Sequence, residues 1–265
     1  MSFLTGENAP AGRILAIASG KGGVGKTVMA AGLAQAFSAQ GERLLLIDGD
    51  LGMANIDVQL GLSPQADLAA VMSGQVLLED ACEPVLGGAA RPGGFDVIPG
   101  RSGSGGLAGL RPDAVNRLAA ACATIALSYE RAILDLAAGA DDSTMRLAMA
   151  ADDVLLVIND EPTSLTDAYA FVKRLRIRDE SAAPLVVVNN APTPDKAREA
   201  YAAFKMTCEK FLGYAPTLAG IVSRDEHVPL AIRAQLPLGQ RSPDCAAMRD
   251  LASLASGLAA GREAA

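Results

Sequence analysis

A glycine-rich segment near the N-terminus constrains this chain more than any other feature. Residues 20–27 read GKGGVGKT and fit the pattern G-x-x-x-x-G-K-[ST]. The segment follows an apolar run, residues 13–19, that is typical of a buried strand, and it precedes residues 26–40, where large apolar side chains recur every fourth position. Backbone N–H groups of such a turn can surround a phosphate at the start of the helix. The sequence therefore predicts a phosphate-binding loop.

The rest of the chain alternates short apolar runs with amphipathic stretches. Strands that are apolar throughout and alternate with helices are typical of a parallel sheet covered on both faces. We therefore expect an α/β fold with one mostly parallel β-sheet flanked by helices on both faces. Strands are expected at residues 13–19, 43–48, 95–99, 131–135, 153–158, 184–188 and 217–222. Helices are expected at residues 26–40, 66–72, 76–81, 112–128, 143–150, 165–176, 194–212, 228–235 and 243–259.

No break in composition divides the 265 residues into two domains. We expect a flexible N-terminus over residues 1–12, a single domain over residues 13–260 and a tail over residues 261–265. The glycine-rich residues 100–109 are expected to form a mobile loop. The N-terminal residues lack the basic and apolar regions of a signal peptide, and no apolar run reaches the length of a membrane span. These patterns predict a cytoplasmic protein, and they leave open a peripheral contact at the inner face of the cell membrane.

Composition narrows the chemistry that the chain could perform. His227 is the single histidine, so a Ser-His-Asp triad or a histidine-rich metal site has almost nothing to work with. Cys82, Cys122, Cys208 and Cys245 form no C-x-x-C or C-x-C pair, and we expect four reduced thiols. The net charge of -7 disfavours autonomous binding to DNA, whose phosphates an acidic surface repels.

The predicted loop assigns a role to each kind of residue within it. Glycines allow the backbone to curl around a phosphate without Cβ clashes, and the helix N-terminus adds its positive end. Lys26 is expected to reach the β- and γ-phosphates, and Thr27 is expected to hold Mg²⁺. The remaining members of the predicted cradle are Gly20, Lys21, Gly22, Gly23, Val24 and Gly25.

Lys21, directly after the first glycine, gives the loop a second lysine that the cradle does not need. With it, the loop resembles that of the MinD/ParA family of deviant Walker A ATPases, which have the SIMIBI type of P-loop NTPase fold. The resemblance implies that Lys21 reaches across a dimer interface to the nucleotide of the partner. It also implies ATP and ADP as ligands. In many relatives a Thr or Ser touches the α-phosphate where this chain has Val28, so that hydroxyl contact is missing here.

Two further segments resemble the switch regions of that family. Residues 48–57 read DGDLGMANID and resemble the first switch, which implies that Asp50 orients the attacking water and that Asp48 lies on the metal side. Carboxylates at the end of a strand beside a phosphate loop commonly perform these two tasks. Residues 135–139 read DLAAG and resemble the second switch, whose aspartate, Asp135, holds Mg²⁺ through water. The family more often has Thr where this chain has Leu136, so no hydroxyl role is expected there.

Recognition of the base is expected at the ends of the later strands. Asn189 follows the predicted strand 184–188, where the family has an asparagine that contacts adenine, and an amide can pair with the adenine edge as donor and acceptor. An asparagine in an ordinary turn after a strand is the alternative. Residues 220–225 read GIVSRD and resemble a second base loop that usually ends P-x-D. Ser223 replaces the proline, which weakens the assignment of Asp225 to base binding.

Four stretches resemble the FlhG/FleN branch of the family more than MinD or ParA. They are residues 50–57, 67–74, 96–103 and 159–169. This branch sets the number or placement of flagella, whereas MinD places the division site. The resemblance implies a slow, dimer-dependent ATPase in which ATP forms a homodimer, the dimer engages a protein partner or the membrane, and hydrolysis releases it.

Two regions bear on the partners of this protein. Residues 243–259 lack the bulk and basic charge of a membrane-targeting helix, so we expect this helix to pack against the sheet. The cations of residues 173–178 either complement the end of a helix dipole or form a docking patch for an acidic partner or anionic lipid. The sequence gives no strong signal for nucleic acid.

Other functions remain open at this level. One alternative is a MinD-like division-site or ParA-like partition ATPase, and another is a regulator that binds a nucleotide without hydrolysing it. A carrier resembling the nitrogenase iron protein would need bridging cysteines near the switches, and Cys82 and Cys122 do not have that setting.

Overall fold

Seven strands that run parallel carry the fold, and each overlaps one of the apolar runs predicted as strands. The computed structural model describes residues 12–50, 52–100 and 111–260. The strands are β1 (Arg13–Ser19), β2 (Leu44–Gly49), β3 (Glu83–Val85), β4 (Phe95–Ile98), β5 (Arg131–Ala138), β6 (Asp153–Ile158), β7 (Leu185–Ala191) and β8 (Thr217–Ser223).

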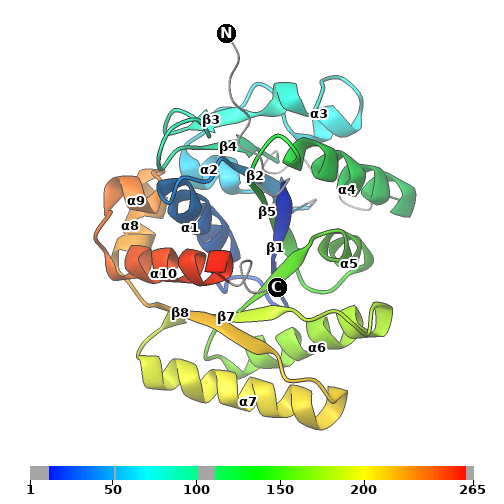
Figure 1. The fold of residues 1–265 in the computed structure, drawn as a ribbon, viewed down its shortest axis with the longest axis vertical. Coiled ribbons are helices and arrows are strands. Elements are labelled where there is room, and N and C mark those ends of the chain that lie inside the picture. Colours follow the sequence, from blue (N-terminus) through cyan, green and yellow to red (C-terminus); the bar gives the residue numbers. More distant parts are fainter. Residues whose placement is uncertain (1–11, 51, 101–110, 261–265) are drawn as a thin grey trace.

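Helices connect the strands and cover the sheet (Figure 1). They are α1 (Lys26–Ala39), α2 (Ile56–Leu60), α3 (Leu68–Met72), α4 (Pro112–Ala126), α5 (Asp142–Met149), α6 (Pro162–Arg178), α7 (Pro194–Leu212), α8 (His227–Ala234), α9 (Leu238–Arg241) and α10 (Ala246–Ala260), together with the 3-10 turn η1 (Glu79–Ala81). Proline at the first position of α4, α6 and α7 suits a helix start, because its missing N–H would have no partner there.

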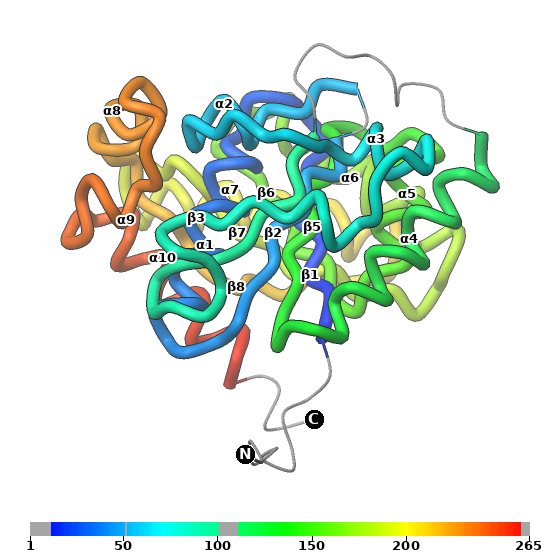
Figure 2. Tube along the Cα trace, turned by 90° about the horizontal axis from the view of Figure 1, so that it is seen from above, coloured from blue at the N-terminus to red at the C-terminus, as the bar shows by residue number. Residues whose placement is uncertain are grey.

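The sheet has the strand order β3-β4-β2-β5-β1-β6-β7-β8. Strand β3 pairs antiparallel with β4, and the other neighbours pair parallel. The strands at the centre are mostly apolar because helices cover both of their faces: every residue of β2 is buried. Figure 2 shows β1 and β5 in the middle of the molecule, with α1 on one side and α4 on the other. The expected α/β class and mostly parallel sheet are confirmed.

Each face of the sheet has its own hydrophobic core. One core joins the sheet to α4, α5, α6 and α7, with Phe171 and Phe204 among its largest buried side chains. The other joins it to α1 and α10, with Phe37 and Leu251. The fit of α10 is close, because a Cβ on Gly32 of α1 would lie 2.5 Å from Cδ1 of Leu251. The apolar side of α10 is thus buried against α1 and β8, which confirms the expected packing.

The structure differs from the expected elements in the segment before β4. A helix was expected at residues 76–81, but only the 3-10 turn at Glu79–Ala81 forms there, and the chain then enters β3. The sequence analysis missed β3 because three residues containing Pro84 give no strand pattern. The loop expected at residues 100–109 lies outside the described residues except for Gly100, as does the flexible N-terminus except for Gly12. Over the described ranges, no helix combines the length and apolar character needed to span a membrane.

Candidate phosphate and nucleotide site

The carboxyl ends of the parallel strands bring the predicted site residues to one edge of the sheet. The loop of residues 20–25 joins β1 to α1, Asp48 lies near the end of β2, and Asp135 lies in β5 between them. Asn189 lies near the end of β7, and Asp225 follows β8. In open parallel sheets this edge is where ligands bind, because helix N-termini and loops converge there.

Two glycines of the loop show why it needs residues without side chains. Gly23 and Gly25 have φ values of +81° and +89°, in the left-handed region that favours glycine. Gly25 has a second constraint, because a Cβ there would lie 2.3 Å from Nδ2 of Asn189. A Cβ on Gly20 would lie 2.1 Å from the backbone of Asp167 in α6. Glycine at these positions therefore allows the loop to approach β7 and α6 more closely than residues with a Cβ could.

Lys26 opens α1 and points into the interior of this edge. Its side chain is only 9% exposed, and Nζ lies 3.0 Å from Oδ1 of Asp135. The hydroxyl of Thr27 also hydrogen-bonds the Asp135 carboxylate. A lysine this deeply buried needs a charged partner, since an unpaired ammonium loses its solvation. The loop lysine and the following threonine thus both contact the aspartate of the predicted second switch.

Asp48 lies beside Asp135 because the two residues are in register on neighbouring strands. Its Oδ1 accepts the N–H of Asp50 at 3.2 Å, and Oδ2 accepts those of Asn55 and Ile56 at 3.0 Å each. Burial, followed by the negative charge of Asp135, raises the pKa of the Asp48 carboxyl to about 7. Burial also raises the pKa of Asp135, although Lys26 acts in the opposite direction.

These residues fit a magnesium ion that is shared with a phosphate. Mg²⁺ in nucleotide sites binds one or two carboxylates together with phosphate oxygens and water. Asp48, Asp135 and the hydroxyl of Thr27 supply oxygen donors of that kind, and a divalent cation would relieve the repulsion between the two buried carboxylates. Within the described ranges, no group of three or more His, Cys, Asp or Glu forms an all-protein metal cage.

Asp50 lies two residues after Asp48, directly after β2, in the segment that leads to α2. Its Oδ1 accepts the N–H groups of Gly52 at 3.1 Å and Met53 at 2.8 Å. The carboxylate therefore organises the turn of its own segment. Asp50 is also close enough for its charge to act on the pKa of Asp135.

Lys21 points toward α6. Its Nζ lies 2.6 Å from Oε2 of Glu161 and 2.8 Å from the hydroxyl of Thr163, both at the start of that helix. The lysine lowers the pKa of the Glu161 carboxyl through this hydrogen bond and its charge. The sequence analysis did not find these two partners, although Pro162 marks a helix start directly after β6 and thus at the same edge of the sheet.

A cavity of about 370 Å³ adjoins the loop on the side of β7 and β8. Val24, Gly25 and Val28 line it from the loop and α1, and Asn189 lines it from β7. Nδ2 of Asn189 donates a hydrogen bond to the backbone oxygen of Val24 at 2.8 Å, so the amide is held against the loop. The opposite wall is apolar and comes from α8 and α10, with Val228, Pro229, Ile232 and Leu251.

Asp225 also lines this cavity, but both of its carboxylate oxygens are bonded within the chain. Oδ1 accepts the backbone N–H of His227 at 2.9 Å and lies 2.7 Å from Nδ1 of its ring, and Oδ2 accepts the N–H of Ala247 at 3.0 Å. Burial acts to raise the pKa of the Asp225 carboxyl, but these hydrogen bonds outweigh it and hold that pKa well below its usual range. Asp225 therefore ties the first residue of α8 to the first turn of α10.

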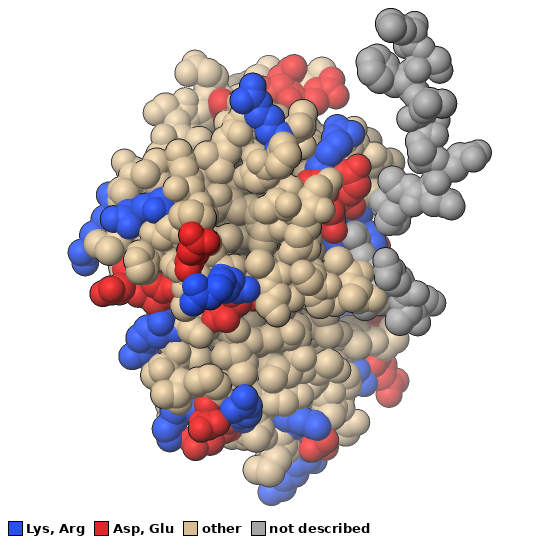
Figure 3. All heavy atoms as spheres, turned by 60° about the vertical axis from the view of Figure 1, so that its left-hand side comes forward, with Lys and Arg blue, Asp and Glu red and all other residues tan. Residues whose placement is uncertain are grey.

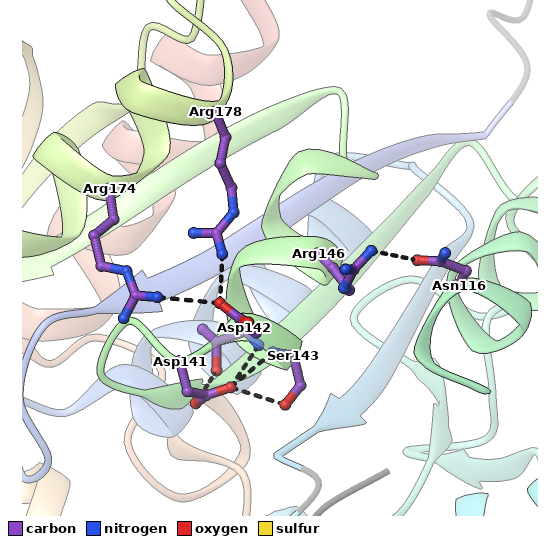
Figure 4. Close-up of polar contacts among 8 residues, drawn as sticks. Asn116, Asp141, Asp142, Ser143, Arg146, Arg174 and Arg178 are labelled. Carbon is purple, nitrogen blue, oxygen red and sulfur yellow. Dashed lines mark hydrogen bonds and ion pairs between the residues drawn. The ribbon is translucent and has the colours of Figure 1, made fainter. Parts of the chain in front are cut away.

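Acidic and basic side chains lie beside one another over the face shown in Figure 3. The cations near the end of α6 follow the same pattern (Figure 4). Arg174 and Arg178 both bind Oδ1 of Asp142 in the first turn of α5. Arg176 donates to the backbone oxygen of Ala182 at 2.8 Å and stacks on the ring of Tyr214. These three arginines are engaged within the chain.

Comparison with known proteins agrees with this geometry. Residues 15–238 match the family model for the CobQ/CobB/MinD/ParA nucleotide-binding domain. The antiactivator FleN of Pseudomonas aeruginosa is 38% identical over 244 residues, which cover 92% of this chain and 83% of that protein. The flagellum site-determining protein YlxH of Helicobacter pylori is 30% identical over 192 residues, which cover 71% of this chain and 62% of that protein.

A solved structure has the same fold. It is the septum site-determining protein MinD of Pyrococcus horikoshii OT3, complexed with Mg-ADP, with a TM-score of 0.76. The two chains are 23% identical, and the match covers 93% of this chain and 95% of that one.

Proposed function

The chain belongs to the CobQ/CobB/MinD/ParA nucleotide-binding family, and from this premise we propose that it is a Mg²⁺-dependent ATPase that acts as a dimerisation switch. In this proposal ATP holds two copies of the chain together, and hydrolysis to ADP and phosphate separates them. The relationship to FleN over most of both chains supports a switch of the FlhG type that regulates the number or placement of flagella.

One observation carries the proposal. Four polar side chains lie together at the edge of the sheet beside the glycine-rich loop: Lys26, Thr27, Asp48 and Asp135. The three charged ones are buried. A cation and two carboxylates buried together are costly unless they serve a ligand. A triphosphate with its metal supplies the missing partners, because its oxygens would bind Lys26 and its metal would lie between the carboxylates and the hydroxyl of Thr27.

The carboxylates and the lysine have separate tasks in this proposal. Thr27, Asp48 and Asp135 would hold Mg²⁺, whose positive charge would offset the negative charge of the phosphates. Lys26 neutralises charge on the β- and γ-phosphates once the nucleotide draws it from Asp135. Asp50 orients the attacking water, and its position beyond Asp48 supports this role because the segment it organises lies beside the metal residues.

The cavity beside the loop is proposed to bind the adenine base. Its wall from α8 and α10 is apolar and suits the flat face of a purine, and Asn189 offers an amide to its edge. The hydrogen bond to Val24 supports this role, since it fixes the amide before a ligand arrives. Asp225 contributes by fixing the wall, because its oxygens already accept hydrogen bonds from α8 and α10.

Lys21 is proposed to complete the site of the second copy in the dimer. Its contacts with Glu161 and Thr163 are at the molecular surface, and the Nζ atom stands outside the cradle formed by its own loop. A lysine held at the surface by two polar groups is available to exchange them for a phosphate of another copy.

The cellular process follows from the relatives. FleN and the flagellum-site protein YlxH support a flagellar role, with an unidentified protein partner and a cytoplasmic location. Contact with the membrane would have to use a surface other than the apolar side of α10, since that side is buried. On the face in Figure 3 acidic and basic side chains are mixed, and the arginines of α6 are engaged within the chain, so these two regions do not form the basic surface that DNA requires.

The test uses size-exclusion chromatography and phosphate release on three proteins. The wild type should be monomeric with ADP and dimeric with ATP, and it should release phosphate slowly. Asp50→Ala should bind ATP, accumulate as a dimer and release no phosphate. Asp80→Ala, on the exposed turn η1, is the matched control and should behave as the wild type. An Asp50→Ala protein that stays monomeric with ATP would contradict the proposed dimerisation switch.

A further inference from the structure

A contact between two short helices links the base-side cavity to the switch carboxylates. Gln235 ends α8, and its Nε2 donates a hydrogen bond of 2.9 Å to the backbone oxygen of Val58 in α2. That carbonyl also accepts the N–H of Gly61 at 3.4 Å, so the side chain of Gln235 adds a second, shorter hydrogen bond at the C-terminal end of α2. The two helices lie next to each other at the same edge of the molecule (Figure 2).

The backbone around this contact is shaped for close approach. Gln235 adopts the left-handed conformation with φ of +52°, which is uncommon for a residue other than glycine. Gly61, directly after α2, has φ of +65°, and a Cβ there would lie 2.8 Å from the backbone oxygen of Gln235. Both helix ends therefore present backbone to each other, with the glutamine side chain between them.

Helix α8 forms part of the cavity wall that faces the loop. Val228, Pro229 and Ile232 line the cavity, and the start of the helix is fixed by Asp225. Only Ala231 of this helix is buried. An element with so few buried contacts has low local stability, so a ligand that packs against it can change its order or position.

Helix α2 is attached to the switch carboxylate at its other end. The backbone N–H groups of Asn55 and Ile56, at the start of α2, both donate to Oδ2 of Asp48. Asp48 also accepts the N–H of Asp50. A shift of α2 would therefore move the donors that orient Asp48 and the segment that carries Asp50.

From this chain of contacts we infer that Gln235 is a positioning residue, which transmits occupancy of the base-side cavity through α2 to Asp48 and Asp50. A ligand with a base would order α8, and the hydrogen bond of Gln235 to Val58 would then also restrict the motion of α2. A ligand with phosphates alone would reach the loop but leave α8 and α2 unaffected. The inference rests on the proposed function only in taking a nucleotide as the occupant of the cavity.

Amide hydrogen exchange of residues 55–60 tests this coupling without any hydrolysis. Wild-type protein is saturated with Mg²⁺ and either ADP or pyrophosphate, with saturation established by calorimetry. ADP should slow exchange of this segment about fivefold or more relative to pyrophosphate, which is the lower range of typical coupling between sites. Gln235→Gly should bind ADP and yet give the same exchange rates with both ligands.

The choice of variants separates coupling from damage to the fold. Glycine suits the left-handed backbone at position 235, so Gln235→Gly removes the side chain without strain. Gly61→Ala disturbs the same contact from α2 and should also abolish the difference between the ligands, whereas Gln240→Ala, at an exposed residue of α9, should preserve it. Thermal unfolding verifies that Gln235→Gly is folded.

The outcomes of the experiment are distinguishable. If Gln235→Gly keeps the extra protection by ADP, or if ADP and pyrophosphate protect the wild type equally, the inference is overturned while the proposed function stands. If the wild type binds neither ligand, the proposed function itself fails, and the inference fails with it. If the variant loses only the difference between the ligands, coupling through Gln235 is supported.

Discussion

Asp48 and Asp135 lie opposite each other in register on β2 and β5, and both side chains are buried. The two carboxylates have different stabilising partners. Asp135 contacts the ammonium of Lys26, whereas Asp48 accepts three backbone N–H groups. Burial raises the pKa of both carboxyls, and the negative charge of Asp135 raises the pKa of Asp48 further, so the site without a ligand is electrostatically strained. A divalent cation is the simplest group that relieves this strain.

This relationship predicts that Mg²⁺ contributes to stabilisation by nucleotide. Mg²⁺ and ADP at about 100 times the dissociation constant should raise the unfolding midpoint of the wild type by about 5 °C or more. A chelator should remove part of that shift. Asp135→Asn should respond to ADP equally with and without Mg²⁺, because one oxygen ligand and one negative charge are lost. Differential scanning calorimetry measures these shifts, and a wild-type shift that the chelator leaves unchanged would contradict the metal site.

Some residues of the site could be predicted from the sequence, whereas the contacts between distant residues could not. Loop residues 20–27 and Asp48 were predictable because each lies in a short local pattern at the end of an apolar strand. The contact of Asn189 with Val24 joins residues 165 positions apart, and no local pattern encodes the hydrogen bond between them. Asp225 shows a further limit, since no local pattern indicates that its carboxylate accepts hydrogen bonds from the starts of α8 and α10, and its contact with the base stays a prediction.

The same holds for the fold: elements with a clear local pattern were predicted, and elements that depend on contacts with distant residues were not. The apolar strands of the centre were found because burial on both faces leaves a continuous apolar run. Helix α6 begins at Pro162, three residues earlier than its apolar periodicity indicated. The periodicity missed the first turn because that turn is polar, and its Thr163 contacts Lys21. Strand β3 forms by pairing with β4, and the sequence of its three residues around Pro84 does not indicate that pairing.

A second prediction concerns the close approach of Gly25 and Asn189. Gly23→Ala and Gly25→Ala both place alanine at positive φ, which costs about 1–2 kcal/mol. Gly25→Ala should cost more, because its Cβ would meet Nδ2 of Asn189, whereas a Cβ at Gly23 meets nothing within 4 Å. Gly23→Ala is therefore the matched control for backbone strain, and urea unfolding gives both free energies.

The Asn189→Ala background isolates the clash from the strain. Once the amide is removed, Gly25→Ala and Gly23→Ala should cost nearly the same free energy of unfolding. The difference between the two backgrounds is the coupling between positions 25 and 189. If Gly25→Ala stays more costly in the absence of the amide, the contact with Asn189 is not the cause.

A third prediction concerns the pH dependence of stability through Asp141, which caps α5. Its Oδ1 accepts the N–H groups of Ser143 at 2.9 Å and Thr144 at 3.0 Å. Partial burial acts to raise the pKa of this carboxyl, but these hydrogen bonds lower it below its usual value. The cap is therefore fully stabilising above the unfolded pKa of about 3.9, and its contribution is lost as the pH falls through the folded pKa.

Two variants separate the cap from its charge. Asp141→Ala should lower the free energy of unfolding by about 1 kcal/mol at pH 7, and by less as the pH falls below about 4. Asp141→Asn keeps a cap that does not titrate, so it should be the more stable of the two at every pH. Urea unfolding between pH 3 and pH 7 measures both. An alanine variant whose deficit grows on acidification would contradict the lowered pKa.

A fourth prediction concerns Lys21 and the dimer. Lys21→Ala should keep nucleotide binding, because Lys26 and the backbone of the loop remain, but it should lose ATP-dependent dimerisation and phosphate release. Its stability should hardly change, since the ion pair with Glu161 is at the surface. Light scattering with ATP and calorimetric titration with ADP measure the two properties separately. Lys173→Ala, an exposed lysine of α6, is the control for loss of positive charge.

The decisive form of this experiment mixes two defects. If Lys21 acts on the nucleotide of the other copy, a Lys21→Ala chain can still receive the lysine of a partner. Mixing it with Asp50→Ala should therefore give mixed dimers with ATP, in which the Lys21→Ala copy has an intact Asp50 and the lysine of its partner. One of the two sites in each mixed dimer should then release phosphate, as follows from the isologous symmetry of a twofold dimer. Asp50→Ala forms dimers by itself but releases no phosphate, so phosphate release is the readout, and its absence from the mixture would place the action of Lys21 within its own chain.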